Sequence, residues 1–374
     1  MFVPKFPPPI VGGLENQSFV LSRELINYSI SIDVLSTLFS KEQFPFELLN
    51  GIKVHRMKLF NSWVMSATYQ FFFIPKFLFH GRNKYNLIHI HQHSLIGIYV
   101  LFFSKLFGYK VVVKLPNLGN NGLIGLYKSY LGGFKIKLLK KADAIIAMTP
   151  LHKNELLDLF FPENIIASIP NGVFVYDNFV PNISNEKIKF CYVGRLEEQK
   201  GILFLLECWA EIAHDYPNII LELWGDGSLK TDIFDLIKYK GLSGSVSLMG
   251  HTDKVIEVLK ASDVFIITSF TEGMSNSILE AMSLGKSIIA SNVGGACLQF
   301  KDNFHNSTYE LNDKFKLIQL IIRNIEDIDF RLDNGKINFN RSKLFHIRNV
   351  ARQYKELYLK VCVGSKLDNL DYDY

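Results

Sequence analysis

Acidic residues are missing from a long stretch of this sequence. Residues 48–142 contain no Asp or Glu, while Lys and Arg recur throughout the same span. The net charge of the 374-residue chain is only +5, so its acids are concentrated at the start of the chain and beyond Ala142. A field of one sign over so much of the chain attracts anionic lipid, anionic sugars or nucleic acid.

Cysteine is scarce, and long apolar runs are absent. The chain has four cysteines, at Cys191, Cys208, Cys297 and Cys362. Their spacing does not suit a metal, so we expect reduced thiols, with Cys191 and Cys297 buried in core elements. The longest uninterrupted apolar run, residues 95–103, is too short to span a bilayer. Because residues 1–5 lead straight into prolines, we expect no signal peptide and a cytoplasmic protein.

The length and the hydrophobic pattern predict two α/β domains. A chain of 374 residues with 48% hydrophobic and 21% charged residues is expected to build two substantial cores. From residue 188 to residue 290, short apolar runs alternate with helical patterns in the order β-α-β-α-β-α-β-α-β. This order predicts a doubly wound parallel sheet that binds its ligand at the carboxyl ends of the strands.

Residues 270–282, F-T-E-G-M-S-N-S-I-L-E-A-M, join a predicted buried strand (263–270) to a predicted helix (277–284). Such a loop presents backbone N–H groups at a helix N-terminus, where an anion binds well. Glu272 and Glu280 lie on either side of those amides, an arrangement that suits a nucleotide-sugar with its phosphates and hydroxyls. The alternative interpretation is a capping box from Ser277 to Glu280, in which Glu280 only caps its own helix.

A second loop, residues 194–201, follows the predicted strand 188–193 and reads G-R-L-E-E-Q-K-G. It places Arg195 and Lys200 between a strand and a helix, where cations and helix amides can meet a diphosphate together. The alternative is a pair of exposed basic residues on an ordinary loop.

These two loops together resemble the retaining glycosyltransferases of family 4, the glycosyl transferases group 1. The resemblance covers most of the chain and is strongest from residue 189 to residue 295. It implies the GT-B fold, with two Rossmann-like doubly wound domains that face each other across a cleft. Residues 1–176 are then expected to bind the acceptor and residues 187–344 the nucleotide-sugar, with the C-terminal segment 345–374 packed back on the first domain.

The resemblance also implies a reaction and roles for residues. The expected reaction transfers a sugar from a nucleotide-sugar, expected to be a UDP-sugar, to an acceptor hydroxyl with retention and without a metal. Glu272, Arg195 and Lys200 are the implied catalytic residues, with Glu272 on sugar hydroxyls, the two cations on the diphosphate, and Glu280 on the ribose. The implied donor-binding residues are Gly12, Gly13, Arg195, Lys200, Gly250, Glu272, Gly273, Met274, Ser275, Asn276 and Glu280.

In the first domain, His91, Lys114 and Asn117 are candidates for the acceptor side of the cleft. His89, His91 and His93 alternate on a predicted strand and would share one face. Three such histidines could bind a metal, but structural or cleft-lining histidines are favoured because no carboxylate or cysteine lies nearby in the sequence. Many relatives have a histidine where this chain has Lys114 and Leu115. Lys114 is a candidate to approach an anion, or a lysine whose ammonium reaches solvent from a strand end.

Residues 52–80 mix basic and aromatic side chains, which favours an element at a membrane interface over a core helix with a basic side. We therefore expect a lipid-linked saccharide acceptor, an anionic membrane surface as a partner, and no nucleic acid. Family resemblance suggests a peripheral protein at the inner membrane face, in bacterial surface polysaccharide or lipopolysaccharide synthesis. The alternatives are a nucleotide-sugar epimerase of the same fold and a non-catalytic nucleotide-sugar-binding subunit.

Overall fold

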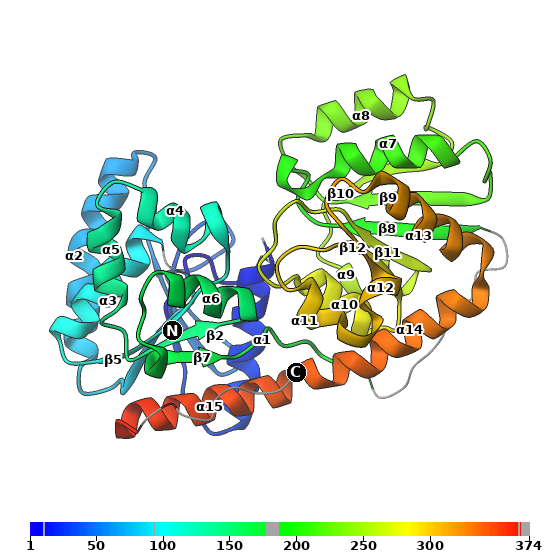
Figure 1. Ribbon diagram of the computed structural model, residues 1–374. Coiled ribbons are helices and arrows are strands. Elements are labelled where there is room, and N and C mark those ends of the chain that lie inside the picture. Colours follow the sequence, from blue (N-terminus) through cyan, green and yellow to red (C-terminus); the bar gives the residue numbers. More distant parts are fainter. Residues whose placement is uncertain (10–11, 93, 177–186, 366, 368–374) are drawn as a thin grey trace. The chain divides into compact units, whose positions relative to one another are not determined.

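The computed structural model describes residues 1–9, 12–92, 94–176, 187–365 and 367. The chain divides into two compact units. Unit 1 is formed by Met1–Gly172 together with Ile347–Tyr374, and unit 2 by Val173–His346. Each unit is an α/β structure built on parallel strands (Figure 1). The polar segment that we interpret as a linker, residues 176–186, lies outside the described residues except for Tyr176.

Unit 1 is organised on two groups of strands. Its strands are β1 (Asp33–Thr37), β2 (Phe46–Leu49), β3 (Ile52–Met57), β4 (Leu87–Ile90), β5 (Lys110–Lys114), β6 (Ala144–Ala147) and β7 (Ile166–Ser168). One group has the order β1-β3-β2, in which β1 and β3 are parallel and β2 is antiparallel to β3. The other group is β4-β5-β6-β7 and is parallel throughout. The prediction of strand 110–114 is confirmed residue for residue by β5.

The first residues of the chain connect these two groups. The prediction of a strand over residues 2–6 is wrong in extent, because only Phe2 forms bridges, one to Leu35 and one to Ile90. The backbone is nevertheless bonded on both sides: the Phe2 N–H donates to the His89 carbonyl at 2.7 Å and the Val3 N–H to the Leu35 carbonyl at 3.0 Å. The short segment therefore fills the gap between β1 and β4.

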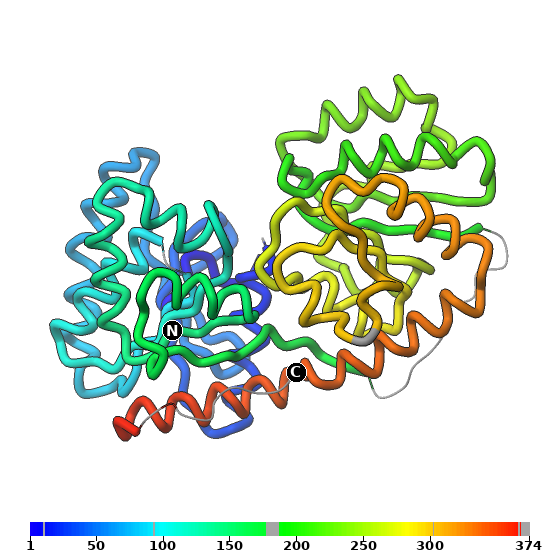
Figure 2. Tube along the Cα trace, viewed as in Figure 1, coloured from blue at the N-terminus to red at the C-terminus, as the bar shows by residue number. Residues whose placement is uncertain are grey.

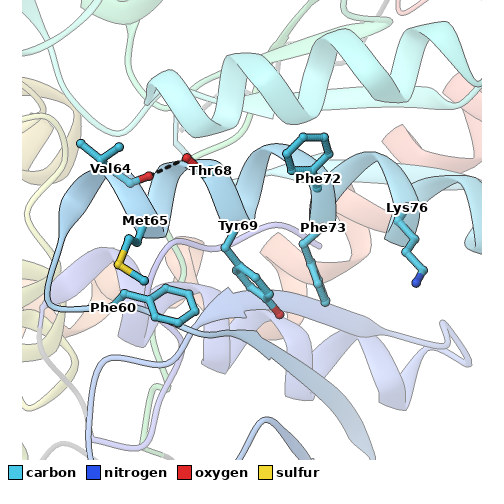
Figure 3. A pocket seen from close by; sticks show the side chains of 8 residues that line it. All are labelled: Phe60, Val64, Met65, Thr68, Tyr69, Phe72, Phe73 and Lys76. Atoms are coloured by element: carbon cyan, nitrogen blue, oxygen red, sulfur yellow. Dashed lines mark hydrogen bonds between the residues drawn. The ribbon is translucent and has the colours of Figure 1, made fainter.

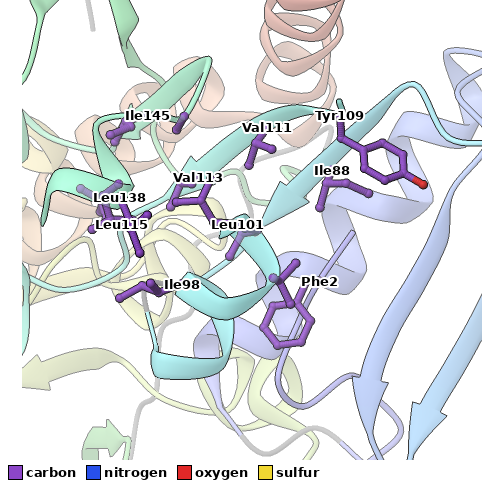
Figure 4. Packing of buried hydrophobic residues seen from close by; sticks show 14 of the residues in the cluster. Phe2, Ile88, Ile98, Leu101, Tyr109, Val111, Val113, Leu115, Leu138 and Ile145 are labelled. Carbon is purple, nitrogen blue, oxygen red and sulfur yellow. The ribbon is translucent and has the colours of Figure 1, made fainter. Parts of the chain in front are cut away.

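Helices cover both faces of the unit 1 strands. They are α1 (Gly13–Asn27), α2 (Trp63–Gly81), α3 (Leu95–Leu106), η1 (Gly119–Asn121), α4 (Leu123–Lys128), α5 (Gly132–Leu139), α6 (Pro150–Asp158), η2 (Glu163–Ile165) and α15 (Ile347–Val363). Because side chains alternate along a strand, β5 places Val111 and Val113 in one core and Val112 in the other. Figure 4 shows the core that includes Phe2, Val111 and Val113.

The last helix belongs to unit 1 although it follows the whole of unit 2 in sequence. In Figure 2 the red C-terminal helix α15 lies beside the blue α1, and the two helices are in contact. Its apolar face, which includes Ile347, Val350 and Leu357, is buried in the core that also holds Leu21 and Leu25 of α1. The tail beyond Gly364 was expected to be mobile, but its residues lie outside the described part except for Ser365 and Leu367.

Unit 2 is a six-stranded parallel sheet. Its strands are β8 (Ile188–Val193), β9 (Ile219–Trp224), β10 (Val246–Gly250), β11 (Val264–Ile267), β12 (Ser287–Ser291) and β13 (Thr308–Tyr309). The spatial order is β10-β9-β8-β11-β12-β13. The chain therefore starts in the middle, moves to one edge, returns and moves to the other, which is the doubly wound Rossmann order. The predictions of strands 188–193 and 219–224 are confirmed residue for residue.

The helices of unit 2 follow from this order. They are η3 (Glu198–Lys200), α7 (Ile202–Ile212), α8 (Lys230–Tyr239), α9 (Val255–Lys260), α10 (Asn276–Ser283), α11 (Ala296–Phe300), η4 (Lys301–Asn303), α12 (Phe304–Ser307), α13 (Lys314–Glu326), α14 (Ile328–Ser342) and η5 (Lys343–Phe345). Because crossovers between parallel strands are right-handed, reversal of the strand order at β8 places α7 and α10 on opposite faces.

The cysteine prediction is right for one residue and wrong for another. Cys191, on β8, is buried, and burial raises the pKa of its thiol to about 12. Cys297 was also expected to be buried, but it is exposed on the short helix α11. The prediction failed because an isolated five-residue helix has no hydrophobic periodicity long enough to indicate which side faces the core.

Candidate functional site

The loops that follow β8 and β11 lie at the point where the strand order of unit 2 reverses. These two strands pair in parallel, and the chain continues from them in opposite directions across the sheet. The carboxyl ends of the strands at such a reversal form the usual ligand crevice of an open α/β sheet. The two loops are the stretches that the sequence singles out for a diphosphate and a sugar.

Backbone hydrogen bonds hold the two loops together. The Phe270 N–H donates to the Gln199 carbonyl at 2.8 Å, and the Thr268 hydroxyl lies 3.1 Å from the Lys200 carbonyl oxygen and 3.0 Å from that of Gly201. Gly201 has a φ of +63°, and a Cβ atom there would lie 2.1 Å from the Thr268 carbonyl oxygen. Only glycine therefore allows this close approach.

Lys200 and Glu272 meet at this junction. The Lys200 ammonium donates to Glu272 Oε1, and both side chains are largely buried. Ser269 donates a second hydrogen bond to the same oxygen at 2.8 Å. The sequence predicts separate partners for these residues, a diphosphate for the lysine and sugar hydroxyls for the carboxylate. The structure places the two groups in contact, so a ligand at this point would touch both.

Arg195 lies on the same loop as Lys200, with an exposed side chain. Its backbone is fixed from the buried strand below, since the Tyr192 hydroxyl donates to the Arg195 carbonyl at 2.8 Å. Burial raises the pKa of Tyr192, and the negative charge of Glu272 raises it further. Tyr192 is therefore a neutral hydrogen-bond donor that holds the Arg195 backbone near the carboxylate.

Helix α10 begins immediately after the Glu272 loop, and its N-cap is Ser275. The Ser275 hydroxyl accepts from the Ile278 N–H at 3.5 Å, and the Ser275 carbonyl accepts from the Gln299 side chain at 2.9 Å. The alternative prediction of a capping box from Ser277 to Glu280 is therefore wrong, because the helix begins two residues earlier. Glu280 lies one turn inside the helix and is half-buried. The positive end of α10 lies beside Gly273 and Met274, which are buried.

Strands β9 and β10 end at the same edge of the sheet as β8 and β11. Gly250 ends β10 with a φ of +82°, and its carbonyl accepts from the Gly225 N–H at 2.8 Å. The following helix, α8, begins at Lys230. Gly227 lies against the Leu196 backbone. A Cβ atom added to Gly227 would be 2.4 Å from the Leu196 carbonyl oxygen.

The remaining predicted residues belong to unit 1. Gly12 is the N-cap of α1, and its carbonyl accepts from the Asn16 N–H at 3.1 Å, while Gly13 is the first residue of the helix. The two residues before them, 10 and 11, lie outside the described part of the chain. Asn117 is exposed in the loop after β5.

Both halves of the chain match sequence models of glycosyltransferases. The sequence model of "Glycosyltransferase Family 4" matches residues 11–175, and that of "Glycosyl transferases group 1" matches residues 177–339. The chain is a member of glycosyltransferase family 4 and has the GT-B fold.

Relatives and solved structures match most of the length of this glycosyltransferase. An uncharacterised glycosyltransferase of Methanocaldococcus jannaschii is 27% identical, over 95% of this chain and 96% of its own. The UDP-Gal:α-D-GlcNAc-diphosphoundecaprenol α-1,3-galactosyltransferase of Escherichia coli is 28% identical, over 76% of this chain and 77% of its own. A crystal structure of Anabaena HepE in complex with UDP-glucose superposes with a TM-score of 0.77 and 18% identity, covering 96% of this chain and 98% of that one.

Lys114 lies at the end of β5, where the resemblance led us to expect a histidine. Its side chain is 2% exposed, which excludes the interpretation of an ammonium that reaches solvent. The ammonium donates to the Asn171 side chain at 2.7 Å and lies 5.7 Å from the centre of the Tyr354 ring on α15. Burial lowers the pKa of Lys114 from its ordinary value of 10.5 to about 7. Its predicted approach to an anion remains a proposal.

The predicted histidines lie in the same interior. His89 and His91 are on one face, with ring centres 4.0 Å apart, and His89 bonds the Tyr358 hydroxyl at 2.6 Å. Burial lowers the pKa of both well below 6.5, and the charge of Lys114 adds to that effect. His91 is 1% exposed, so a role towards the acceptor also remains a proposal. His93 lies outside the described residues, and within them no group of three or more His, Cys, Asp or Glu could hold a metal.

Several residues that shape the site were not predicted from sequence. Ser269, Gln299 and Tyr192 position Glu272, Ser275 and Arg195, and Asn171 is the partner of Lys114. Each is a polar side chain in or next to a strand or short helix, and nothing local distinguishes it from a surface residue. Ser269 was the most accessible to prediction, because it directly follows a buried strand and lies three residues before Glu272.

Proposed function

We propose that this glycosyltransferase transfers a sugar from a UDP-sugar to a hydroxyl of a lipid-linked saccharide, with retention at the anomeric carbon. The observation that supports this most directly is the contact between Lys200 and Glu272 at the switch point of unit 2. A cation that can hold a phosphate and a carboxylate that can accept from hydroxyls are thereby adjacent, as the phosphate and the sugar are in a nucleotide-sugar.

The proposed roles follow from the positions of these groups. Arg195 and Lys200 bind the diphosphate and stabilise the charge that develops when the nucleotide leaves. Gly273, Met274, Ser275 and Asn276 lie around the positive end of α10 and approach the phosphates and the sugar through their backbone. Glu272 accepts hydrogen bonds from sugar hydroxyls, Glu280 from the ribose, and Gly250 lies near the base. Gly12 and Gly13, at the start of α1, keep their proposed role towards the donor.

The chemical step is a substitution on one face of the sugar. The acceptor oxygen forms a bond to the anomeric carbon on the side from which the phosphate leaves. The bond between that carbon and the phosphate oxygen breaks, and the acceptor proton passes to the departing phosphate. The two cations neutralise the diphosphate in this scheme, and the proposal assigns no role to a metal.

The acceptor side of the proposal rests on unit 1. Residues 48–142 have no acidic side chain, and the surface of α2 exposes several aromatic residues, including Trp63 and Phe72. No described helix is long and apolar enough to cross a bilayer. The name of the Escherichia coli relative says that it acts on a diphosphoundecaprenol-linked sugar. We therefore place the protein peripherally on the inner face of the membrane, in the synthesis of a bacterial surface polysaccharide or lipopolysaccharide, with His91, Lys114 and Asn117 towards the acceptor.

Turnover of a panel of UDP-sugars, with a lipid-linked saccharide as acceptor, tests the proposed function. We expect transfer with one donor, and a loss of at least about 100-fold in kcat/KM for Lys200→Ala, since a phosphate-binding cation contributes several kcal/mol in the transition state. Lys238→Ala, on the exposed side of α8, is the matched control and should keep full activity. Donor isomerised without an acceptor would identify an epimerase, and binding without any turnover a non-catalytic subunit.

Flotation with vesicles tests the proposed membrane partner separately. The protein should float with vesicles that contain anionic lipid, and its flotation should fall as the salt concentration rises, because the attraction comes from exposed charges. Equal flotation with neutral and anionic vesicles would remove the electrostatic basis of this part of the proposal.

A further inference from the structure

Helix α2 has its polar and apolar residues in unusual places. Its buried positions are Ser66, Gln70, Ile74, Leu78 and Gly81, a narrow stripe that includes two polar side chains. The surface side carries large apolar residues instead, with Trp63 79% and Phe72 68% exposed. A helix that is apolar on nearly all sides is normally enclosed by protein or lipid. Here the structure leaves most of that apolar surface uncovered.

A groove is formed on this surface. It encloses about 530 Å³, within the range of ligand pockets, and Figure 3 shows the side chains that line it. Its aromatic wall is a continuous series: Tyr69 stacks on Phe73 with ring centres 5.3 Å apart and meets Phe60 edge-on at 5.7 Å. Met65 completes this side of the groove in the figure. The lining therefore offers apolar surface to a ligand.

The hydroxyl groups of the groove already have partners in the protein, and that of Tyr69 is bonded to the Lys58 backbone. The Thr68 hydroxyl donates to the Val64 carbonyl at 2.8 Å, which leaves its methyl group for the groove. Lys76 is the charged residue of the lining, and no Asp or Glu lies within the sequence span 48–142 around it. The groove thus combines a long apolar surface with a single cation.

Hydrogen bonds to buried groups make the groove a fixed feature. Phe60 is held from below, because its N–H donates to the buried Ser66 hydroxyl at 2.8 Å and its carbonyl accepts from that hydroxyl at 3.1 Å. Pro75 lacks the N–H that would bond the Phe71 carbonyl within the helix. Tyr99 of α3 supplies that bond with its hydroxyl, at 2.7 Å. Ser66, one of the two polar residues of the buried stripe, therefore supports a wall of the groove.

We propose that this groove binds the hydrocarbon chain of a phosphate-headed lipid, with the phosphate against the Lys76 ammonium. The apolar lining and the single cation match the two parts of such a molecule, and none of the residues that line the groove carries a negative charge. The inference deepens the proposed function, because it identifies the part of unit 1 that would hold the lipid of a lipid-linked acceptor.

Calorimetric titration with dodecyl phosphate, below its critical micelle concentration, tests the groove on the full chain. We expect one saturable site per chain, weaker binding of dodecyl maltoside, which has the same chain and an uncharged head, and no binding of inorganic phosphate. Lys76→Gln should weaken dodecyl phosphate about fivefold, the contribution of one lysine beside an anionic head group, and leave dodecyl maltoside unchanged. Equal affinity of the wild type for the two amphiphiles would overturn the role of Lys76.

A matched pair of variants separates the groove from general adsorption. Phe72→Asp and Phe102→Asp each replace an exposed phenylalanine by a carboxylate, so they change the net charge equally, but only Phe72 lines the groove. Phe72→Asp should weaken dodecyl phosphate at least about tenfold, since it introduces a like charge into the apolar lining, and Phe102→Asp by less than about twofold. If both variants lost affinity for dodecyl phosphate to a similar degree, with unchanged melting temperatures, the amphiphile would be adsorbing to the exposed apolar surface in general. That result would overturn the groove as its binding site.

Sugar transfer to a water-soluble acceptor distinguishes the two proposals. If the lipid groove is right and the proposed function is wrong, dodecyl phosphate binds as described but no UDP-sugar is turned over. If the reverse holds, transfer to the soluble acceptor proceeds while the amphiphiles show no saturable site. Where both hold, Phe72→Asp raises KM for the lipid-linked acceptor and leaves kcat with the soluble acceptor unchanged.

Discussion

At the scale of single residues, the contact between Lys200 and Glu272 is the most informative feature of the site. Without a ligand the two groups satisfy each other, and Ser269 adds a hydrogen bond to the carboxylate. A diphosphate must therefore compete with Glu272 for the lysine, and a sugar must compete with the lysine for Glu272. A nucleotide-sugar can satisfy both groups at once, whereas a free nucleotide satisfies only one.

Glu272→Gln tests this competition. We expect UDP to bind more tightly, by about fivefold or more, because Lys200 is left without an anionic partner in a largely buried position and the diphosphate can replace it. Turnover should fall at least about tenfold, because the sugar loses a charged hydrogen-bond acceptor. Calorimetry measures the first effect and steady-state kinetics the second. Unchanged UDP affinity together with unchanged turnover would contradict the site assignment.

The buried amine of Lys114 gives a prediction for pH. Its pKa is lowered by burial to about 7 in the folded protein and returns to 10.5 on unfolding. Between these values the unfolded chain binds more protons, so the contribution of Lys114 to stability rises as the pH increases from about 7 towards 10, by at most about 1.4 kcal/mol per pH unit. Lys114→Met should remove this rise.

The measurement is the melting temperature from pH 8 to pH 9.5, compared between the wild type and Lys114→Met. This window avoids the amino terminus, whose pKa is lowered by burial to about 5, and the comparison cancels the opposite effect of buried thiols and tyrosines with raised pKa values. Lys137→Met, on the exposed side of α5, is the control and should behave as the wild type. Parallel curves for all three proteins would contradict a neutral buried amine.

The residue scale also shows where sequence reasoning stops. The types of Lys200, Arg195 and Glu272 were recognisable because each follows a strand in a loop that resembles a known motif. The pairing of Lys200 with Glu272 was not, because 72 residues separate them and only the strand order brings them together. The capping-box alternative failed for a related reason: Ser275 and Ser277 are two serines close to the start of α10, and local sequence does not decide that Ser275 is the N-cap and Ser277 the second residue of the helix.

At the scale of elements, the loops of unit 2 depend on glycines that allow backbone segments to touch. Gly294 has a φ of +55°, and a Cβ atom there would lie 2.0 Å from the Glu272 carbonyl oxygen. Gly294→Ala should displace the Glu272 loop and lower kcat/KM at least about tenfold, since small displacements of a positioned group are costly. It should also lower the stability by about 1 kcal/mol through the left-handed backbone.

Gly244→Ala is the matched control for this variant, because an added Cβ there meets nothing within 4 Å. Kinetics on folded protein, with the unfolded fraction measured by circular dichroism, separates displacement from unfolding. If Gly294→Ala and Gly244→Ala had the same kcat/KM, the Gly294 contact would have no role in positioning Glu272.

Elements buried on both faces were the most predictable. Strands such as β11 and β12 lie inside a parallel sheet and are buried along their whole length, so each contains a continuous apolar run that ends at a loop. The first segment of the chain was harder, since Met1 to Val3 acts as a strand but is too short to give a pattern. Helix α2 was recognised as unusual from its mixture of aromatic and basic residues. Which side of α2 is buried could not be predicted from sequence, because both the buried and the exposed sides include residues that favour a core.

At the scale of the whole molecule, the chain combines two units with separate cores and separate chemistry. The loops that we propose for the donor belong to unit 2, while the basic, apolar surface and the buried Lys114 belong to unit 1. Sequence alone indicated two α/β domains of this kind, because each has its own alternation of strands and helices. The choice of sugar and acceptor was not readable, since it depends on side chains that converge from many elements.

A ligand that binds one unit should stabilise that unit and not the other. At a UDP concentration of about 100 times its Kd, binding stabilises the folded site by about 2.7 kcal/mol, which corresponds to roughly 5–10 °C for a unit of this size. Scanning calorimetry with and without UDP should show this rise for the wild type and for Lys114→Met, whose substitution lies in unit 1. Lys200→Ala should reduce the rise at the same UDP concentration, because the diphosphate loses a cation. An equal rise in Lys200→Ala would place the nucleotide elsewhere, and the assignment of both loops as the donor site would fail with it.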